Sequence, residues 1–264
     1  TFSAINQFSG NENEDTSLRV LAKLENDHYD LIITITSDSM VPATHRLINT
    51  PWLFTNVNNP KFFGIRDMQN PGNNKSGVTY YVPIVNQLTL FNEIMQGKIK
   101  KIGIIFDYNA KSRRAELIEF REAALTLGME YIIERVKNEN ELLDITRGMA
   151  KEGVNAIILT SSGKIYNNIN LILKFTNKKK IPIFSVNKRA VKYGAVGAMA
   201  SDYYSMVDEN LIPMVIDVLK NGKKPGNMPV QYLNNPRIYL NLTQAKKLGL
   251  EIPNKLKDSA SKKY

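Results

Sequence analysis

Short apolar runs alternate with stretches of helical periodicity from Val82 onward. The apolar runs occupy residues 102–106, 131–133, 156–159 and 181–184. Runs of this length are typical of strands buried on both faces of a sheet. Apolar residues spaced by three or four predict helices over 84–95, 112–127, 142–149 and 165–172. The alternation therefore predicts a parallel, doubly wound α/β sheet with right-handed crossovers.

The two ends of the chain continue this pattern. A helix is predicted around Leu18–Leu24, with strands at 31–36 and 52–55. After Tyr203 we expect a long helix to about Lys220, adjusted at Pro213 because proline disturbs a helix interior. A strand near 238–240 and a short helix capped by Thr243 follow. Two sheets are therefore predicted, with one α/β lobe interrupted by the other.

Composition narrows the chemistry. The 264 residues carry a net charge of +10, but Lys and Arg are spread along the chain, which favours an ordinary solvated surface over a nucleic-acid site. The absence of Cys and the presence of only two His argue against thiolate catalysis and a multi-His metal site, so no cofactor is expected. No apolar run is long enough to span a membrane, and no leader with basic and apolar regions precedes the first helix.

Sequence motifs of several common functions are missing. No Gly-x-Gly-x-x-Gly turn or phosphate-loop Lys follows a predicted strand, and neither His28 nor His45 neighbours a nucleophile-elbow pattern. An enzyme is therefore not expected. A repressor effector domain is disfavoured because no helix-turn-helix pattern is present.

An ordered set of short segments resembles the bacterial ABC-transporter substrate-binding proteins, whose members include aromatic amino-acid binders. The segments cover nearly the whole chain in the right order. They are DLII at 30–33, Ser37 and Ser39, Thr50-Pro51, Val57 and Pro60, PGNNKSGV at 71–78, Gln87-Leu88, KKIGI at 100–104, Leu127-Gly128, IPIF at 181–184, Gly194-Ala195, Asp202-Tyr203-Tyr204 and NLTQAKKLG at 241–249.

This resemblance implies a solute receptor that is not an enzyme. It implies a monomer that binds a small polar ligand, an amino acid or a related molecule, between two lobes and delivers it to the permease of an ABC importer. It also implies export to the periplasm or to the outer face of the cell membrane, with any signal or lipid anchor outside this chain. The alternative is a ligand-binding sensor domain of a signalling protein, which the gene neighbourhood or a longer chain distinguishes.

The resemblance also implies the lobe boundaries. Residues 1–79 and 202–264 are expected to form lobe 1, and residues 80–201 lobe 2, with a type I periplasmic-binding architecture and a multi-strand hinge. The small residues of GAVGAMA at 194–200 are expected to let crossing strands approach closely at that hinge. Relatives begin with a strand and helix before the point that matches residues 2–6, their second strand, so the first strand and helix of lobe 1 are expected to be missing from this chain.

The candidate ligand-binding residues of lobe 1 and of the two crossings follow predicted strands or flank the crossings. Ser37, Asp38 and Ser39 open a helix after a buried strand, where hydroxyls and free N–H groups suit an anion. The alternative is ordinary helix capping. Tyr80 stands at one crossing and either contacts ligand or packs within the hinge, and Asp202 is an acid that the family pattern retains at the other.

The candidate residues of lobe 2 lie in loops at the ends of strands. They either contact the ligand or stabilise an ordinary turn and helix cap. They are Tyr108, Ser112, Ser161, Ser162 and Asn187. Relatives often carry Pro-Thr-Asp where this chain has Thr-Ser-Ser at 160–162, and an acidic pair where it has Asn187-Lys188. Two partners for a ligand ammonium are thus neutral or basic here, and a ligand with more hydroxyl or anionic character is an open alternative.

Overall fold

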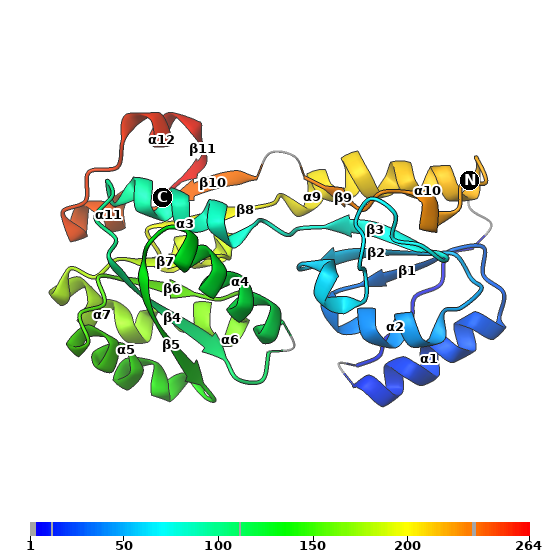
Figure 1. The fold of residues 1–264 in the computed structure, drawn as a ribbon, viewed down its shortest axis with the longest axis horizontal. Coiled ribbons are helices and arrows are strands. Elements are labelled where there is room, and N and C mark those ends of the chain that lie inside the picture. Colours follow the sequence, from blue (N-terminus) through cyan, green and yellow to red (C-terminus); the bar gives the residue numbers. More distant parts are fainter. Residues whose placement is uncertain (1–3, 12, 111, 234–235) are drawn as a thin grey trace. The chain divides into compact units, whose positions relative to one another are not determined.

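The chain folds into two compact units in a computed structural model that describes residues 4–11, 13–110, 112–233 and 236–264 (Figure 1). Unit 1 comprises residues 1–81 and 202–234, and unit 2 comprises residues 82–201 and 235–264. Each unit is built on its own sheet.

Unit 1 has a four-stranded, all-parallel sheet in the order β1-β2-β3-β9. Helices cover both faces. Leu21 and Leu24 pack with Trp52 and Phe54 on one face, whereas Leu53 packs with Met214 on the other, as expected when successive residues of a strand point in opposite directions. The elements are α1 (Glu14–Asn26), β1 (Ile32–Ile35), α2 (Met40–Arg46), β2 (Trp52–Val57), β3 (Lys75–Thr79), α9 (Tyr203–Met206), α10 (Ile212–Leu219) and β9 (Gln231–Tyr232).

A π-helical turn over residues 207–211 joins α9 to α10, and it is the adjustment of the long helix that was expected at Pro213. Pro213 occupies the first turn of α10. Proline has no N–H and its ring clashes with the carbonyl one turn back, so the wider turn accommodates it where a regular α-helix does not.

Unit 2 has a seven-stranded sheet in the order β11-β10-β8-β7-β6-β4-β5, parallel except between β8 and β10. Its strands are β4 (Lys101–Asp107), β5 (Glu130–Val136), β6 (Ala156–Leu159), β7 (Ile183–Ser185), β8 (Gly197–Ala200), β10 (Arg237–Leu240) and β11 (Ala260–Lys263). Its helices are α3 (Ile84–Ile94), α4 (Arg113–Thr126), α5 (Leu142–Lys151), α6 (Gly163–Tyr166), α7 (Asn170–Lys179), α8 (Lys188–Tyr193), α11 (Leu242–Leu248) and α12 (Asn254–Ser259).

Two apolar clusters pack against opposite faces of this sheet. Phe91 of α3 and Phe120 of α4 lie in one cluster with Ile104, while Leu142 of α5 and Ile172 of α7 lie in the other. The prediction of an α/β fold with parallel, doubly wound sheets is confirmed.

The expected place of the C-terminal segment is wrong. Residues 235–264 belong to unit 2, not with residues 202–234. The physical reason is strand pairing: β10 runs antiparallel to β8 over four residue pairs, and its Leu240 is fully buried beside the α3 side chains.

The strand expected at residues 2–6 is absent where it can be examined. Residues 2 and 3 lie outside the described residues, and residues 4–6 are irregular. β1 is the edge of its sheet, and among the described strands it pairs with β2 alone. On β1, Ile33 and Ile35 are 43% and 60% exposed.

The small residues at 194–200 are explained by packing inside unit 2. A Cβ on Gly197 would lie 2.8 Å from Cδ1 of Ile94, so α3 packs directly on this part of β8. Gly194 ends α8 with a φ of 125°, a conformation that other residues rarely adopt. Helix packing and a turn thus account for both glycines.

Candidate functional site

The loop after β1 carries the first candidate residues. Ser37–Ser39 forms a short 3₁₀ turn, in which Asp38 is exposed and both serines are half-buried. Thr36 precedes it with φ 77° and ψ 158°, a region occupied almost only by glycine. Such strain costs on the order of 1–3 kcal/mol and concentrates at ligand sites and switches, so this loop is a candidate site on backbone grounds as well.

Both serine hydroxyls of this turn are engaged. Ser37 Oγ accepts a hydrogen bond from the N–H of Asn58, 3.1 Å away, which ties the turn to the end of β2. Ser39 Oγ donates to the carbonyl oxygens of Ile35 and Thr36 at 3.0 and 2.8 Å. Among the hydrogen bonds of the described residues, the Ser37 hydroxyl appears only as an acceptor. Its proton is therefore available to a further acceptor.

Tyr80 and Asp202 lie close together in unit 1. The ring of Tyr80, just past β3, packs edge-on against the ring of Tyr203, with centroids 5.7 Å apart. Asp202 is the N-cap residue of α9 and accepts a hydrogen bond from Ser205 Oγ at 3.2 Å. The Tyr80 N–H bonds the carbonyl of Val57 at the end of β2. The structure thus brings the unit 1 candidates to the carboxyl edge of one sheet, where α/β folds bind ligands.

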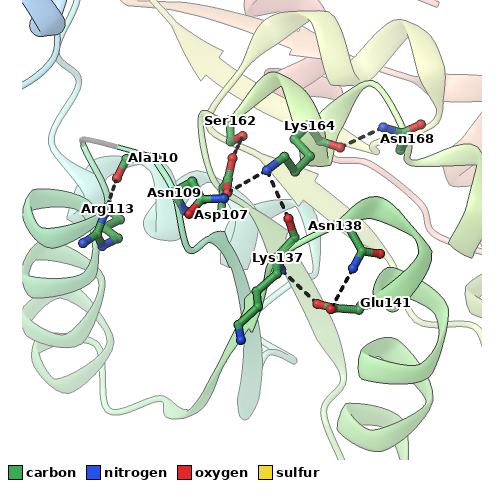
Figure 2. A network of polar contacts seen from close by, with 10 residues as sticks. All are labelled: Asp107, Asn109, Ala110, Arg113, Lys137, Asn138, Glu141, Ser162, Lys164 and Asn168. Carbon is green, nitrogen blue, oxygen red and sulfur yellow. Dashed lines mark hydrogen bonds and ion pairs between the residues drawn. The ribbon is translucent and has the colours of Figure 1, made fainter. Parts of the chain in front are cut away.

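In unit 2, Asp107 at the end of β4 is the centre of a polar network (Figure 2). Its carboxylate accepts from Ser162 Oγ at 2.8 Å and from the Asn109 N–H at 2.9 Å, and it pairs with Lys164 Nζ at 3.4 Å. Burial raises the pKa of Asp107, but these hydrogen bonds and the Lys164 charge outweigh burial, so the pKa lies below its usual value. The carboxylate is therefore charged and satisfied.

The pKa of a second carboxyl group in unit 2 is shifted in the opposite direction. Glu116, in the first turn of α4, is 4% exposed and accepts hydrogen bonds from the hydroxyl and the N–H of Ser161 and from the side chain of Ser112. Burial raises its pKa above the usual value, and the hydrogen bonds offset burial only in part. Two of the predicted ligand residues, Ser112 and Ser161, thus donate hydrogen bonds to a buried carboxyl group.

The two remaining candidates of unit 2 lie at different strand ends. Asn187 follows β7 and caps α8, where its side-chain oxygen accepts from the Arg189 N–H at 2.9 Å. Tyr108 follows Asp107 and is 42% exposed, with the guanidinium groups of Arg113 and Arg135 over its ring. Ser161 and Ser162 lie with Asp107 and Tyr108 across the adjacent strands β4 and β6.

Sequence reasoning missed Asp107, Glu116 and Thr36 as functional candidates. Asp107 had a usable signal, because it ends an apolar strand at the edge where ligands bind. Glu116 reads as a favourable acid in a first helical turn, and Thr36 reads as a β-branched strand residue, so neither stands out. No group of three or more His, Asp or Glu side chains suited to a metal occurs among the described residues. Within that same part of the chain, every helix is too short or too polar to cross a membrane.

Comparison with known proteins gives a consistent result. The family model described as ABC transporter substrate binding protein matches residues 4–264. A tyrosine-binding protein of Clostridioides difficile (strain R20291) is 24% identical over 237 residues, which is 89% of this chain and 68% of the relative.

Two solved structures share the fold. A ligand-free, open substrate-binding protein with adhesive properties from Clostridium difficile superposes with a TM-score of 0.78 at 22% identity, covering 95% of this chain and 83% of its own. An ABC domain in complex with L-Trp from Streptococcus pneumonia gives a TM-score of 0.77 at 20% identity, covering 96% and 86%.

Proposed function

The chain belongs to the ABC transporter substrate-binding protein family, and on this premise we propose that it captures an amino acid or a related small polar solute and delivers it to the permease of an ABC importer. The single observation that carries the proposal is the family match over residues 4–264. Family members are binding proteins, and the chemistry at the strand ends of both units suits binding.

The ligand groups of the proposal lie at the carboxyl ends of the strands. In unit 1 these are the Ser37 hydroxyl beside the strained Thr36, together with Tyr80 and Asp202. In unit 2 they are Tyr108 and Ser162, which flank the Asp107 network. Ordered hydroxyl, carboxylate and aromatic groups of this kind fix the orientation of a small polar ligand.

Amino acids are the first class to test, because the relatives named above bind tyrosine and L-Trp. The proposal places capture outside the cytoplasm, as in other members of the family, either in the periplasm or at the outer face of the membrane. The protein is proposed to act there as a monomer. The family match supports delivery to an importer over the alternative of a signalling sensor.

A thermal-shift screen with amino acids, small peptides, sugars and organic acids tests the proposal. A solute present at a hundred times its Kd stabilises the protein by about 2.7 kcal/mol. Asp202→Asn and Ser162→Ala are expected to weaken binding of the hit by tenfold or more. Ser261→Ala, at an exposed serine of β11, is the matched control and leaves binding unchanged.

Two results would count against the proposal. If no solute of these classes shifts the melting temperature, the transport function is wrong. If a solute binds equally well to Asp202→Asn, Ser162→Ala and the control, the function stands but the assigned residues are wrong.

A further inference from the structure

Three cationic side chains converge on the ring of Tyr108. The Arg113 and Arg135 guanidinium carbons lie 5.4 and 5.5 Å from the ring centroid, and Lys137 Nζ lies 6.0 Å from it. Arg113 comes from the start of α4, and Arg135 and Lys137 come from the end of β5 and the residue after it. Elements distant in sequence thus gather three positive charges around one aromatic side chain.

The three cations lack a carboxylate partner at ion-pair distance within the residues that the structure describes. None of them forms an ion pair there. The carboxylate of Asp107 is already held by Lys164 and Ser162. Glu141 accepts hydrogen bonds from the backbone N–H of Lys137 and from Asn138. Like charges gathered around one ring repel one another, so an anion bound beside them lowers the electrostatic energy.

Two further features favour the binding of an anion beside Tyr108. Helix α4 has 14 residues and begins at Arg113, so its N-terminal partial positive charge faces the same region. The acid in its first turn, Glu116, is buried, and burial raises its pKa, which reduces the negative charge that it contributes. The hydroxyl of Tyr108, on an exposed side chain, adds a hydrogen-bond donor.

We propose that Tyr108, Arg113, Arg135 and Lys137 bind a single oxyanion group, a carboxylate or a phosphate, carried by the solute that the protein captures. This inference rests on the proposed function and narrows its substrate class to solutes that carry an acidic group besides the α-carboxylate common to all amino acids. Each of the three charged groups lies within 6.0 Å of the centroid of the same ring. Guanidinium groups suit this role because their planar N–H pairs match carboxylate and phosphate oxygens.

Isothermal titration of the full chain tests the inference. The probes are glutamate, citrate and inorganic phosphate as oxyanions, with tyrosine and glutamine as solutes that lack an extra acidic group. The triple variant Arg113→Gln, Arg135→Gln, Lys137→Gln removes the cationic cluster. The matched control is Lys174→Gln, Lys178→Gln, Lys179→Gln, which removes three exposed charges from α7.

We expect at least one oxyanion probe to bind the natural chain, to bind the cluster variant tenfold or more weakly, and to bind the control unchanged. Tyr108→Phe keeps the ring, loses the hydroxyl, and is expected to weaken binding two- to fivefold. Equal loss in both triple variants, or no loss in either, overturns the inference. Circular dichroism of each variant separates loss of binding from loss of folding.

The outcome also separates this inference from the proposed function. If tyrosine or glutamine binds while the oxyanions do not, the acidic substrate class is wrong and the transport function stands. If no organic solute binds, the transport function is wrong. Phosphate binding that disappears in the cluster variant then still supports an oxyanion site at Tyr108.

Discussion

At the scale of single residues, unit 2 holds two carboxyl groups with opposite tendencies near the ends of neighbouring strands. Asp107 is surrounded by donors and a cation, which favour its charged form. Glu116 lies deeper, where burial favours its neutral form despite its serine partners. The two groups therefore impose different pH dependences on the same unit.

Replacing Asp107 with Asn is expected to destabilise the protein at neutral pH by about 1.5–3 kcal/mol, the range for hydrogen bonds to charged groups. The folded-state pKa lies below the usual 3.8, so the stabilisation is fully present above 3.8 and is lost as the pH falls through the folded value. Urea unfolding at several pH values measures this. A stability gap between the two proteins that stays constant down to pH 2 contradicts the assignment.

Replacing Glu116 with Gln is expected to remove a pH-dependent loss of stability. The folded-state pKa lies above the usual 4.5, so the natural protein loses stability as the pH rises from 4.5 through the folded value. The Gln variant keeps an acceptor for Ser161 and carries no charge, so its stability relative to the natural protein increases with pH. Glu122→Gln, on the exposed side of α4, is the control and shows no such trend. Parallel curves for Glu116→Gln and the natural protein would refute the raised pKa.

The sequence identifies strand-end loops but not the partners of individual side chains. Ser161 and Ser162 were predicted as ligand groups because of their place after an apolar strand. In the structure one bonds Glu116 and the other bonds Asp107, residues 45 and 55 positions away. Such pairings depend on which strands become neighbours, and local sequence does not contain that information.

At the scale of elements, β3 lies close against the backbone of β2 at Gly77. A Cβ there would lie 2.2 Å from the carbonyl oxygen and 2.6 Å from the nitrogen of Phe54. These are backbone atoms of a buried strand, so they have little freedom to move.

Gly77→Ala is therefore expected to destabilise unit 1 by at least about 2 kcal/mol. Gly103→Ala in β4 is the matched control, because its new Cβ would meet Sδ of Met149 at 2.6 Å, the end of a flexible side chain. The control is expected to cost less than about 1.5 kcal/mol. Thermal unfolding followed by circular dichroism ranks the two variants, and an equal or smaller effect of Gly77→Ala disproves the close approach.

Strongly apolar elements were predictable, and polar ones were not. The apolar strands at 102–106 and 156–159 appear as β4 and β6. β11, with the sequence ASKK, reads as a charged tail, and β3, with the sequence KSGVT, reads as a crossing segment. Both become strands because a neighbouring strand pairs with their backbone, and tertiary pairing of this kind overrides side-chain preference.

At the scale of the whole molecule, unit 1 carries a fluorescent reporter of its own unfolding. Trp52 is the single tryptophan of the chain and is fully buried in unit 1. Its fluorescence follows the unfolding of unit 1, whereas circular dichroism follows both units.

Leu240→Ala tests the assignment of residues 235–264 to unit 2. Leu240 is fully buried in the core of that unit, so the truncation is expected to cost 2–5 kcal/mol there. Circular dichroism is expected to show an earlier transition while the Trp52 transition stays in place. The matched variant Leu53→Ala, fully buried in unit 1, shifts the Trp52 transition instead. An earlier Trp52 transition in Leu240→Ala would count against the assignment.

The sequence predicted two α/β units because strand–helix repeats and the family resemblance agree. It placed residues 235–264 in the wrong unit because the pattern around β10 shows that a strand forms but not which sheet accepts it. The decisive contacts, from β10 to β8, join residues about 40 positions apart.

The discontinuity of both units has a consequence for how the protein is made. Unit 1 needs β9, at residues 231–232, and unit 2 needs β10 and β11, which end at Lys263. During synthesis, the sheet of unit 2 is therefore incomplete until Lys263 has left the ribosome. A nascent chain that stops before β9 therefore lacks a strand of each sheet, and neither unit can complete its fold at that stage.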